Sequence, residues 1–67
     1  MTDVVRLKEA IKESGFRRRF IANKMGVGYD RFCKACNGAI EFKASEVKEL
    51  SEILNLSLEQ MRDIFLT

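Results

Sequence analysis

Apolar side chains recur at three- and four-residue intervals along this chain, and no other feature of the sequence restricts its fold as strongly. Val4, Leu7 and Ile11 repeat at the spacing of one face of an α-helix, and charged side chains fill the opposite face. Later stretches show the same spacing, and none shows the sustained two-residue alternation of a half-buried β-strand. The sequence therefore predicts an all-α fold.

Glycine and asparagine residues divide the helical pattern into short segments. Both residue types tolerate the positive φ in which many helices end. The expected helix ends are Gly15, Gly26, Asn37-Gly38 and Asn55. Ser45 is expected at the N-terminal cap or in the first turn of the fourth segment, and Ser57 at the cap of the fifth. The five predicted helices lie at about 4–14, 17–25, 29–36, 45–54 and 58–65.

The same spacing predicts which side chains form the core. Within each segment, the inward positions are the apolar residues that recur every three or four places. In the second to fifth segments they are Phe20, Ile21, Ala22, Met25, Phe32, Ala35, Val47, Leu50, Ile53, Leu54, Leu58, Met61, Ile64 and Phe65. Ile40 and Phe42 alternate in the connection before the fourth segment and are expected to plug the core.

The size of the chain and its lack of histidine exclude most catalytic chemistry. With 67 residues it is predicted to form a single domain, residues 1–67, with little room for an enclosed catalytic cavity. Cys33 and Cys36 alone cannot fill a tetrahedral zinc site, although a dimer would pool four thiolates. Without histidine there is no Ser–His or Cys–His pair. We therefore expect no enzyme activity, no metal, no cofactor and two reduced cysteines.

The hydropathy of the chain argues against a membrane location. No apolar run approaches the ~20 residues that a membrane-spanning helix needs. The N-terminal residues do not combine a charged start with an apolar core, as a secretory signal does. The expected compartment is the cytoplasm, and no membrane partner is expected.

Charge is distributed unevenly along the chain. Residues 1–16 are neutral overall, and residues 39–67 carry a net charge of −3. Residues 17–38 carry a net charge of +5, because Asp30 alone opposes Arg17, Arg18, Arg19, Lys24, Arg31 and Lys34. A basic block of this kind points to a polyanionic partner for the middle of the chain. The alternative is a solvated basic face without a partner.

Two short predicted helices and the glycine-containing turn between them fit a helix-turn-helix at about 17–37. Ala22 is small enough for the two helices to approach closely, and Gly26 supplies the turn conformation. In the general docking geometry the start of the second of these helices enters the major groove of DNA, while the helix before it lies against the backbone. The outward residues of that second helix are Tyr29, Asp30, Arg31, Cys33 and Lys34.

Three segments of the chain match the pattern of one protein family. They are residues 21–28 (IANKMGVG), residues 37–38 (NG) and residues 54–59 (LNLSLE). From Leu7 to Phe65 the chain resembles the lambda-repressor/Cro-like (XRE-type) helix-turn-helix domains of bacteria and their phages. The resemblance implies a compact five-helix fold and sequence-specific binding of an operator as a homodimer, with transcriptional repression. In its small size the chain is most similar to a Cro-type regulator of a phage or mobile element.

The resemblance and the outward positions together assign site residues. Residues expected to read bases are Tyr29, Asp30, Cys33 and Lys34, and those expected to bind phosphates are Arg17, Arg18, Arg19, Arg31 and Asn37. The sequence departs from the family at Arg18, where glutamine is usual, and at Gly28, where a serine or threonine cap is common. Two of these assignments have an alternative. Asp30 either reads a base or stabilises its helix start and pairs with Lys34. Tyr29 either reads a base or packs its ring on the protein with only the hydroxyl pointing outward.

An apolar cluster at the end of the sequence has two interpretations. Ile64, Phe65 and Leu66 either complete the core or form part of a dimer contact, because an exposed apolar cluster usually marks a partner. The function also has an alternative: a protein-binding antirepressor or modulator that keeps this scaffold and acts on another phage regulator. Asp30, Cys33 and the absence of glutamine at position 18 favour that alternative.

Overall fold

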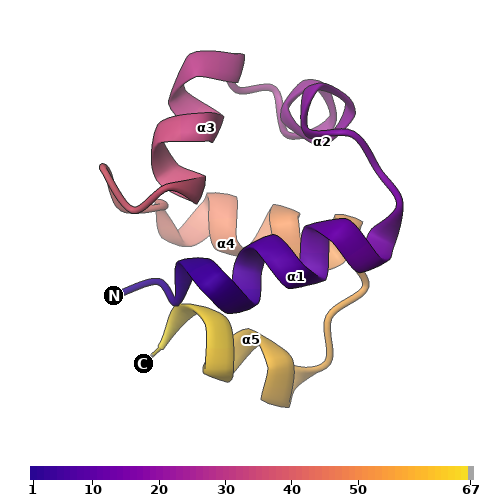
Figure 1. The fold of residues 1–67 in the computed structure, drawn as a ribbon, viewed down its shortest axis with the longest axis vertical. Helices are drawn as coiled ribbons and strands as arrows, with labels where there is room; N and C mark the ends of the chain where they lie inside the picture. Colours follow the sequence, from indigo (N-terminus) through magenta and orange to yellow (C-terminus); the bar gives the residue numbers. More distant parts are fainter. Residues whose placement is uncertain (67) are drawn as a thin grey trace.

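The chain folds into five α-helices joined by short connections (Figure 1). The computed structural model describes residues 1–66, and no β-strand occurs among them. The helices are α1 (Val4–Ser14), α2 (Arg18–Met25), α3 (Tyr29–Cys36), α4 (Ala44–Ile53) and α5 (Leu58–Phe65). The predicted all-α fold and the number of helices are thus confirmed for this part of the chain.

Left-handed residues end the helices where the sequence predicts. Gly15 and Gly26 follow α1 and α2 with φ of 76° and 71°, and Asn55 follows α4 with φ of 54°. The fifth helix begins as predicted, because the Ser57 hydroxyl accepts a hydrogen bond from the Gln60 N–H at 3.1 Å. In return, the Gln60 side chain accepts one from the Ser57 N–H at 2.9 Å. This reciprocal pair is a capping box.

Both ends of the described chain are tied together. The Asp3 carboxylate caps α1 by accepting a hydrogen bond from the Arg6 N–H at 3.1 Å. The Asp3 N–H donates to the Ile64 carbonyl in the last turn of α5 at 2.6 Å. Figure 1 shows α1 lying between α5 and the α2–α3 pair, with both termini on the same side.

The core draws at least one side chain from every helix. Leu7, Ile21, Phe32 and Leu50 are fully or almost fully buried, and Ile64 and Phe65 add the contribution of α5. An aromatic series runs through the centre of this core, since the Phe42 ring lies 6.4 Å from the ring of Phe32 and 5.8 Å from the ring of Phe65. Phe42 is partly buried and packs against the core as predicted, whereas Ile40, which was expected to do the same, is not among the described side chains that pack there.

Two residues that the sequence assigned to the core are exposed in the structure. Phe20 is 45% exposed, because Ile21, Ala22 and Met25 form the buried face of α2 and Phe20 points away from it. Leu58 is 65% exposed, because it is the first residue of α5. Cys36, which the apolar pattern did not assign to the core, is completely buried.

The start of α4 decides between the two positions expected for Ser45. The helix begins at Ala44, so Ser45 lies within its first turn and not at its cap. The helix ends at Ile53, one residue before the predicted end at Leu54. The new boundary places Glu46 in the first turn, and this proves important for the position of α3.

Replacing Leu50 tests the packing of this core. Leu50 is fully buried, so Leu50→Ala should lower the free energy of unfolding by about 2–5 kcal/mol, which is the range for truncating a buried leucine. Leu58→Ala makes the same chemical change at an exposed position and should stay within about 0.5 kcal/mol. Urea titrations of the two variants measure both values. Equal effects would contradict the described core.

Candidate nucleic-acid interface

The α2–α3 unit is closed by backbone hydrogen bonds around Gly26. The Gly26 N–H donates to the Asn23 carbonyl and the Val27 N–H donates to the Ala22 carbonyl, both at 3.1 Å. Ala22 is buried and Val27 packs partly against the core. A side chain at position 26 would be strained in this left-handed conformation. The turn therefore fixes α3 relative to α2.

Asp30 and Lys34 form the outermost part of α3. Both side chains are exposed, and they lie one helical turn apart because they are four residues apart. Within residues 1–66 no ion pair joins them, so the pairing that belonged to one of the two alternatives for Asp30 is not present. Asp30 lies in the first turn of α3, where a negative charge is favourable against the helix dipole.

Tyr29 leans back onto α2 and does not stand free. The guanidinium carbon of Arg19 lies 4.1 Å from the centre of the Tyr29 ring, which is a cation–π distance. Hydrogen bonding to the Cys33 side chain raises the pKa of the Tyr29 hydroxyl above its ordinary value of 10.0. Tyr29 stays partly exposed and Cys33 is half-buried. These side chains therefore form one bridge between the two helices, with the phenol protonated at neutral pH.

Three arginines and one tyrosine surround an open hollow. Arg17, Arg18, Arg19 and Tyr29 line a space of about 380 Å³ at the N-terminal end of α2. No carboxylate of the described residues forms an ion pair with any of the three arginines. Cations at a helix N-terminus oppose the helix dipole, so the helix itself gains nothing from them. The hollow therefore presents unpaired guanidinium groups to an anion.

Arg31, by contrast, is not a free cation. Its Nε and Nη2 donate to the two carboxylate oxygens of Glu46 at 3.0 and 2.9 Å, a bidentate pair between α3 and α4. Glu46 also accepts a hydrogen bond from the Lys43 N–H at 2.8 Å, and its side chain is only 9% exposed. The hydrogen bonds from Arg31 hold the pKa of the Glu46 carboxyl below its ordinary value and raise that of Arg31. Arg31 thus anchors α3, and its charge is offset before any phosphate approaches.

Glu46 was missed by the sequence interpretation. A glutamate three residues after a helix cap often accepts a hydrogen bond from the backbone at that cap. Placing the cap at Lys43 would have drawn attention to Glu46, but the prediction left Ser45 open as the cap or as a residue of the first turn and did not name Lys43. Its pairing with Arg31 carries no local signal, because the two residues lie 15 positions apart.

The remaining predicted site residues fall into two groups. Asn37 is exposed at the end of α3, and its expected phosphate contact stays a prediction. Ile64 and Phe65 are 4% and 7% exposed and complete the core, which is one of the two interpretations left open for them. Leu66 is 73% exposed and is the one member of that cluster left at the surface.

The part of the chain that the structure describes contains one buried thiol, Cys36, and no cluster of acidic side chains and cysteines placed to hold a metal ion. Burial raises the pKa of the Cys36 thiol to about 11, so it stays protonated at neutral pH. Among residues 1–66, no three of the Cys, Asp and Glu side chains come together in a way that would hold a metal ion. Within the same residues, none of the helices has the length and apolar character required to cross a membrane.

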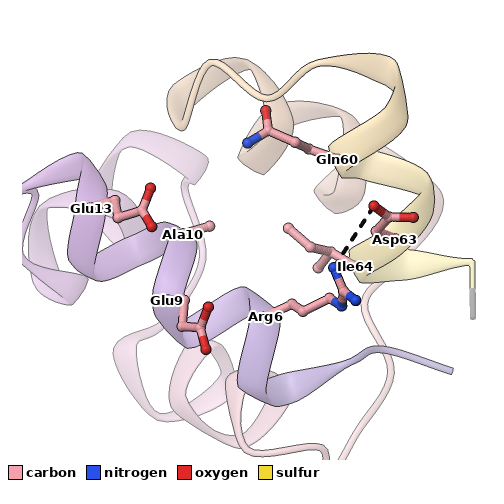
Figure 2. A pocket seen from close by; sticks show the side chains of 7 residues that line it. All are labelled: Arg6, Glu9, Ala10, Glu13, Gln60, Asp63 and Ile64. Carbon is pink, nitrogen blue, oxygen red and sulfur yellow. Dashed lines mark ion pairs between the residues drawn. The ribbon is translucent and has the colours of Figure 1, made fainter.

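A second hollow, between α1 and α5, has the opposite electrostatic character (Figure 2). It measures about 140 Å³, and Glu9, Glu13 and Asp63 line it together with Arg6. Figure 2 shows Arg6 reaching across to Asp63, with 3.8 Å between Nη1 and Oδ2. Because carboxylates outnumber the one paired cation, this hollow does not suit a phosphate. The hollow at the start of α2, lined by Arg17, Arg18, Arg19 and Tyr29 and called here the arginine hollow, does suit a phosphate.

The α2–α3 face offers the groups that contact nucleic acids. Three guanidinium groups and the Tyr29 ring line one hollow, and Lys34 and Asn37 are exposed on α3 and at its end. Groups of these kinds bind phosphates and base edges. Comparison with protein-family models, with curated proteins and with solved structures finds no match for this chain. The function of this face is therefore inferred from the side chains that it carries.

Removing Glu46 tests the anchor of α3. Glu46→Ala should lower the free energy of unfolding at pH 7 by about 1–3 kcal/mol, because it removes hydrogen bonds to a charged group. The pKa of Glu46 is lower in the folded chain than in the unfolded one. Its stabilisation is therefore complete above about pH 4.3, the ordinary glutamate value, and is lost as the pH falls through the folded value.

Thermal unfolding between neutral and acidic pH measures this difference. Glu52→Ala is the matched control, since Glu52 is exposed on the same helix and forms no ion pair within the described chain. The gap between wild type and Glu46→Ala should narrow in acid, whereas the control should follow wild type throughout. A gap that does not change with pH would show that the carboxylate charge is not what holds α3.

Proposed function

We propose that this chain is a sequence-specific DNA-binding transcriptional regulator of Cro type, in which α2 and α3 act as the helix-turn-helix of a lambda-repressor-like domain. The observation that carries the proposal is the arginine hollow beside the exposed face of α3. Unpaired cations and an exposed helix on one surface suit the backbone and the major groove of double-stranded DNA. The regulator acts in the cytoplasm by occupying an operator and excluding polymerase.

In this proposal the two helices have different tasks. Arg17 and Arg18 contact phosphates, and Arg19 does so from a position fixed by its stacking on the Tyr29 ring. Lys34 lies on the outward side of α3 and can donate to guanine O6 or N7. Asp30, one turn before it, can accept from the amino group of cytosine. Phosphate contacts thus fix the register, and α3 reads the sequence.

The Arg31–Glu46 pair supports the same task indirectly. A reading helix needs a fixed orientation, because a misplaced side chain loses its hydrogen bonds to a base edge. The bidentate pair ties the side of α3 that faces α4, while the Tyr29–Arg19 contact ties the side that faces α2. Asp30 and Lys34 lie between these two attachments. We therefore assign Arg31 to positioning in place of the phosphate contact predicted from the sequence.

Selection of bound duplexes from a random pool tests the proposed function. We expect a defined site to be enriched, with an affinity that falls linearly with salt concentration on a log–log plot as phosphate counterions compete. No enrichment, together with no salt-dependent binding to any duplex, would reject DNA binding. That result would favour the antirepressor-type protein binder.

Two substitutions separate positioning from reading. Arg18→Ala should weaken binding to all sequences about equally and reduce the salt slope by about one, because it removes one phosphate contact. Lys34→Ala should cost about 1–3 kcal/mol on the preferred site and relax the choice at one base pair. Affinities for the preferred duplex and its single-base variants at two salt concentrations measure both effects.

Lys48→Ala serves as the control for these substitutions. Lys48 is an exposed cation on α4 and does not line the arginine hollow, so its loss should leave the base preference and the salt slope nearly unchanged. If Arg18→Ala alters the base preference and Lys34→Ala does not, α3 is not the reading helix.

A further inference from the structure

Asp30 is the one acidic residue among residues 17–38, and its carboxylate is unpaired. Six basic residues belong to the same segment of the sequence. Even so, within the described residues 1–66 neither a hydrogen bond nor an ion pair engages the Asp30 side chain. No cation of this part of the chain therefore offsets the negative charge on the exposed face of α3.

The fold itself gains little from this carboxylate. α3 begins after Gly28 without a side-chain cap, and Asp30 does not accept a hydrogen bond from the free N–H groups of the first turn. Its contribution to the helix is limited to a favourable interaction with the helix dipole, which is weak at an exposed position and is screened by salt. Glu46, by comparison, holds two helices together through the same kind of group.

On a surface that meets DNA, a free carboxylate is repelled by most of what it approaches. Phosphates carry negative charge, and the major-groove edges of guanine, adenine and thymine present acceptor atoms, whereas an ionised carboxylate can only accept. Cytosine presents an amino donor without an acceptor of its own, and adenine presents its amino group beside the N7 acceptor. Asp30 is therefore compatible with cytosine above all other bases.

Lys34 has the opposite requirement. Its ammonium group has three donors and no acceptor, and guanine offers two acceptors, O6 and N7, in the major groove. Like Asp30, Lys34 is exposed, and no ion pair within the described chain engages it. One residue of α3 thus requires a donor from the DNA and the other requires acceptors.

The spacing of these two residues limits how far apart their bases can lie. Four residues of an α-helix rise by about 6 Å, and successive base pairs of B-DNA lie about 3.4 Å apart. Asp30 and Lys34 are four residues apart, and both are exposed. Together they can therefore contact base pairs that are no more than about two steps apart.

We propose that Asp30 determines the specificity of α3 by exclusion: it accepts cytosine and repels the other bases. The preferred site then contains two G·C pairs no more than about two steps apart, one contacted by Asp30 and the other by Lys34. This inference rests on the proposed function, because it describes how the same face selects its DNA. The cations of α2 and α3 alone would favour any duplex, whereas the carboxylate weakens binding wherever cytosine is missing.

Two substitutions of Asp30 test this role on the duplex selected from a random pool, on its single-base variants and on a random duplex. Asp30→Ala should bind the random duplex about fivefold more tightly than wild type, since it removes one like-charge contact. It should also lose discrimination at one G·C pair. Asp30→Asn replaces the carboxylate by an amide that pairs with N6 and N7 of adenine, so the preferred base at that position should change from cytosine to adenine by at least about fivefold.

Glu9→Gln is the control, because it removes the same charge as Asp30→Asn at another exposed side chain. Glu9 lines the hollow between α1 and α5, and in Figure 1 α1 lies between α5 and the α2–α3 pair. The control should keep the base preference of the wild type and its affinity for the random duplex. Circular dichroism verifies that each variant keeps its helices.

The outcomes separate this inference from the function on which it rests. A wild-type chain that binds no duplex would overturn both. A wild-type chain that selects a defined site, with Asp30 variants that keep either its base preference or its affinity for the random duplex, would overturn the role of Asp30 alone. A selected site without two G·C pairs at the stated spacing would do the same.

Discussion

No helix in the described residues 1–66 is long enough to be stable alone, and every other property of the structure depends on that constraint. The five helices have 8 to 11 residues, whereas isolated helices shorter than about 12–15 residues are marginal in water. Each helix therefore persists only while its apolar side chains are buried against the others. Because α3 carries Phe32 on one side and Asp30 and Lys34 on the other, the outward face has a fixed position only as long as the core is intact.

The cations on the surface of this small domain differ in whether a carboxylate pairs with them, and this difference separates structural cations from those free to bind an anion. Glu46 neutralises Arg31 and joins α3 to α4, which removes one cation from the basic block and gives it a structural role. The three arginines at the start of α2 keep their charge, since no carboxylate of the described residues pairs with them. The net charge of residues 17–38 therefore overstates the number of cations free to meet a polyanion. What matters is which cations remain unpaired.

The sequence predicted features that depend on residues close together in the chain and missed those that depend on residues far apart in it. Helix ends depend on one or two residues, so Gly15, Gly26 and Asn55 were sufficient to locate them. The inward face of an eight-residue helix is harder to predict, because apolar residues adjacent in sequence, such as Phe20 and Ile21, point in different directions. The Arg31–Glu46 pair was beyond prediction, since it requires the relative placement of two helices. The structure brings three of the predicted arginines and Tyr29 to one hollow, and it pairs Arg31 with Glu46. The contacts of these residues with DNA stay predictions.

The hydrogen bond between the Asp3 N–H and the Ile64 carbonyl has a consequence for local unfolding. The first turn of α1 and the last turn of α5 support one another, so fraying of either end removes a partner from the other. Such segments open as one cooperative unit with a free energy below that of global unfolding. We expect amide hydrogens at the two ends to exchange with solvent together. The turn between α2 and α3, closed by its own backbone hydrogen bonds, can keep its protection while they do.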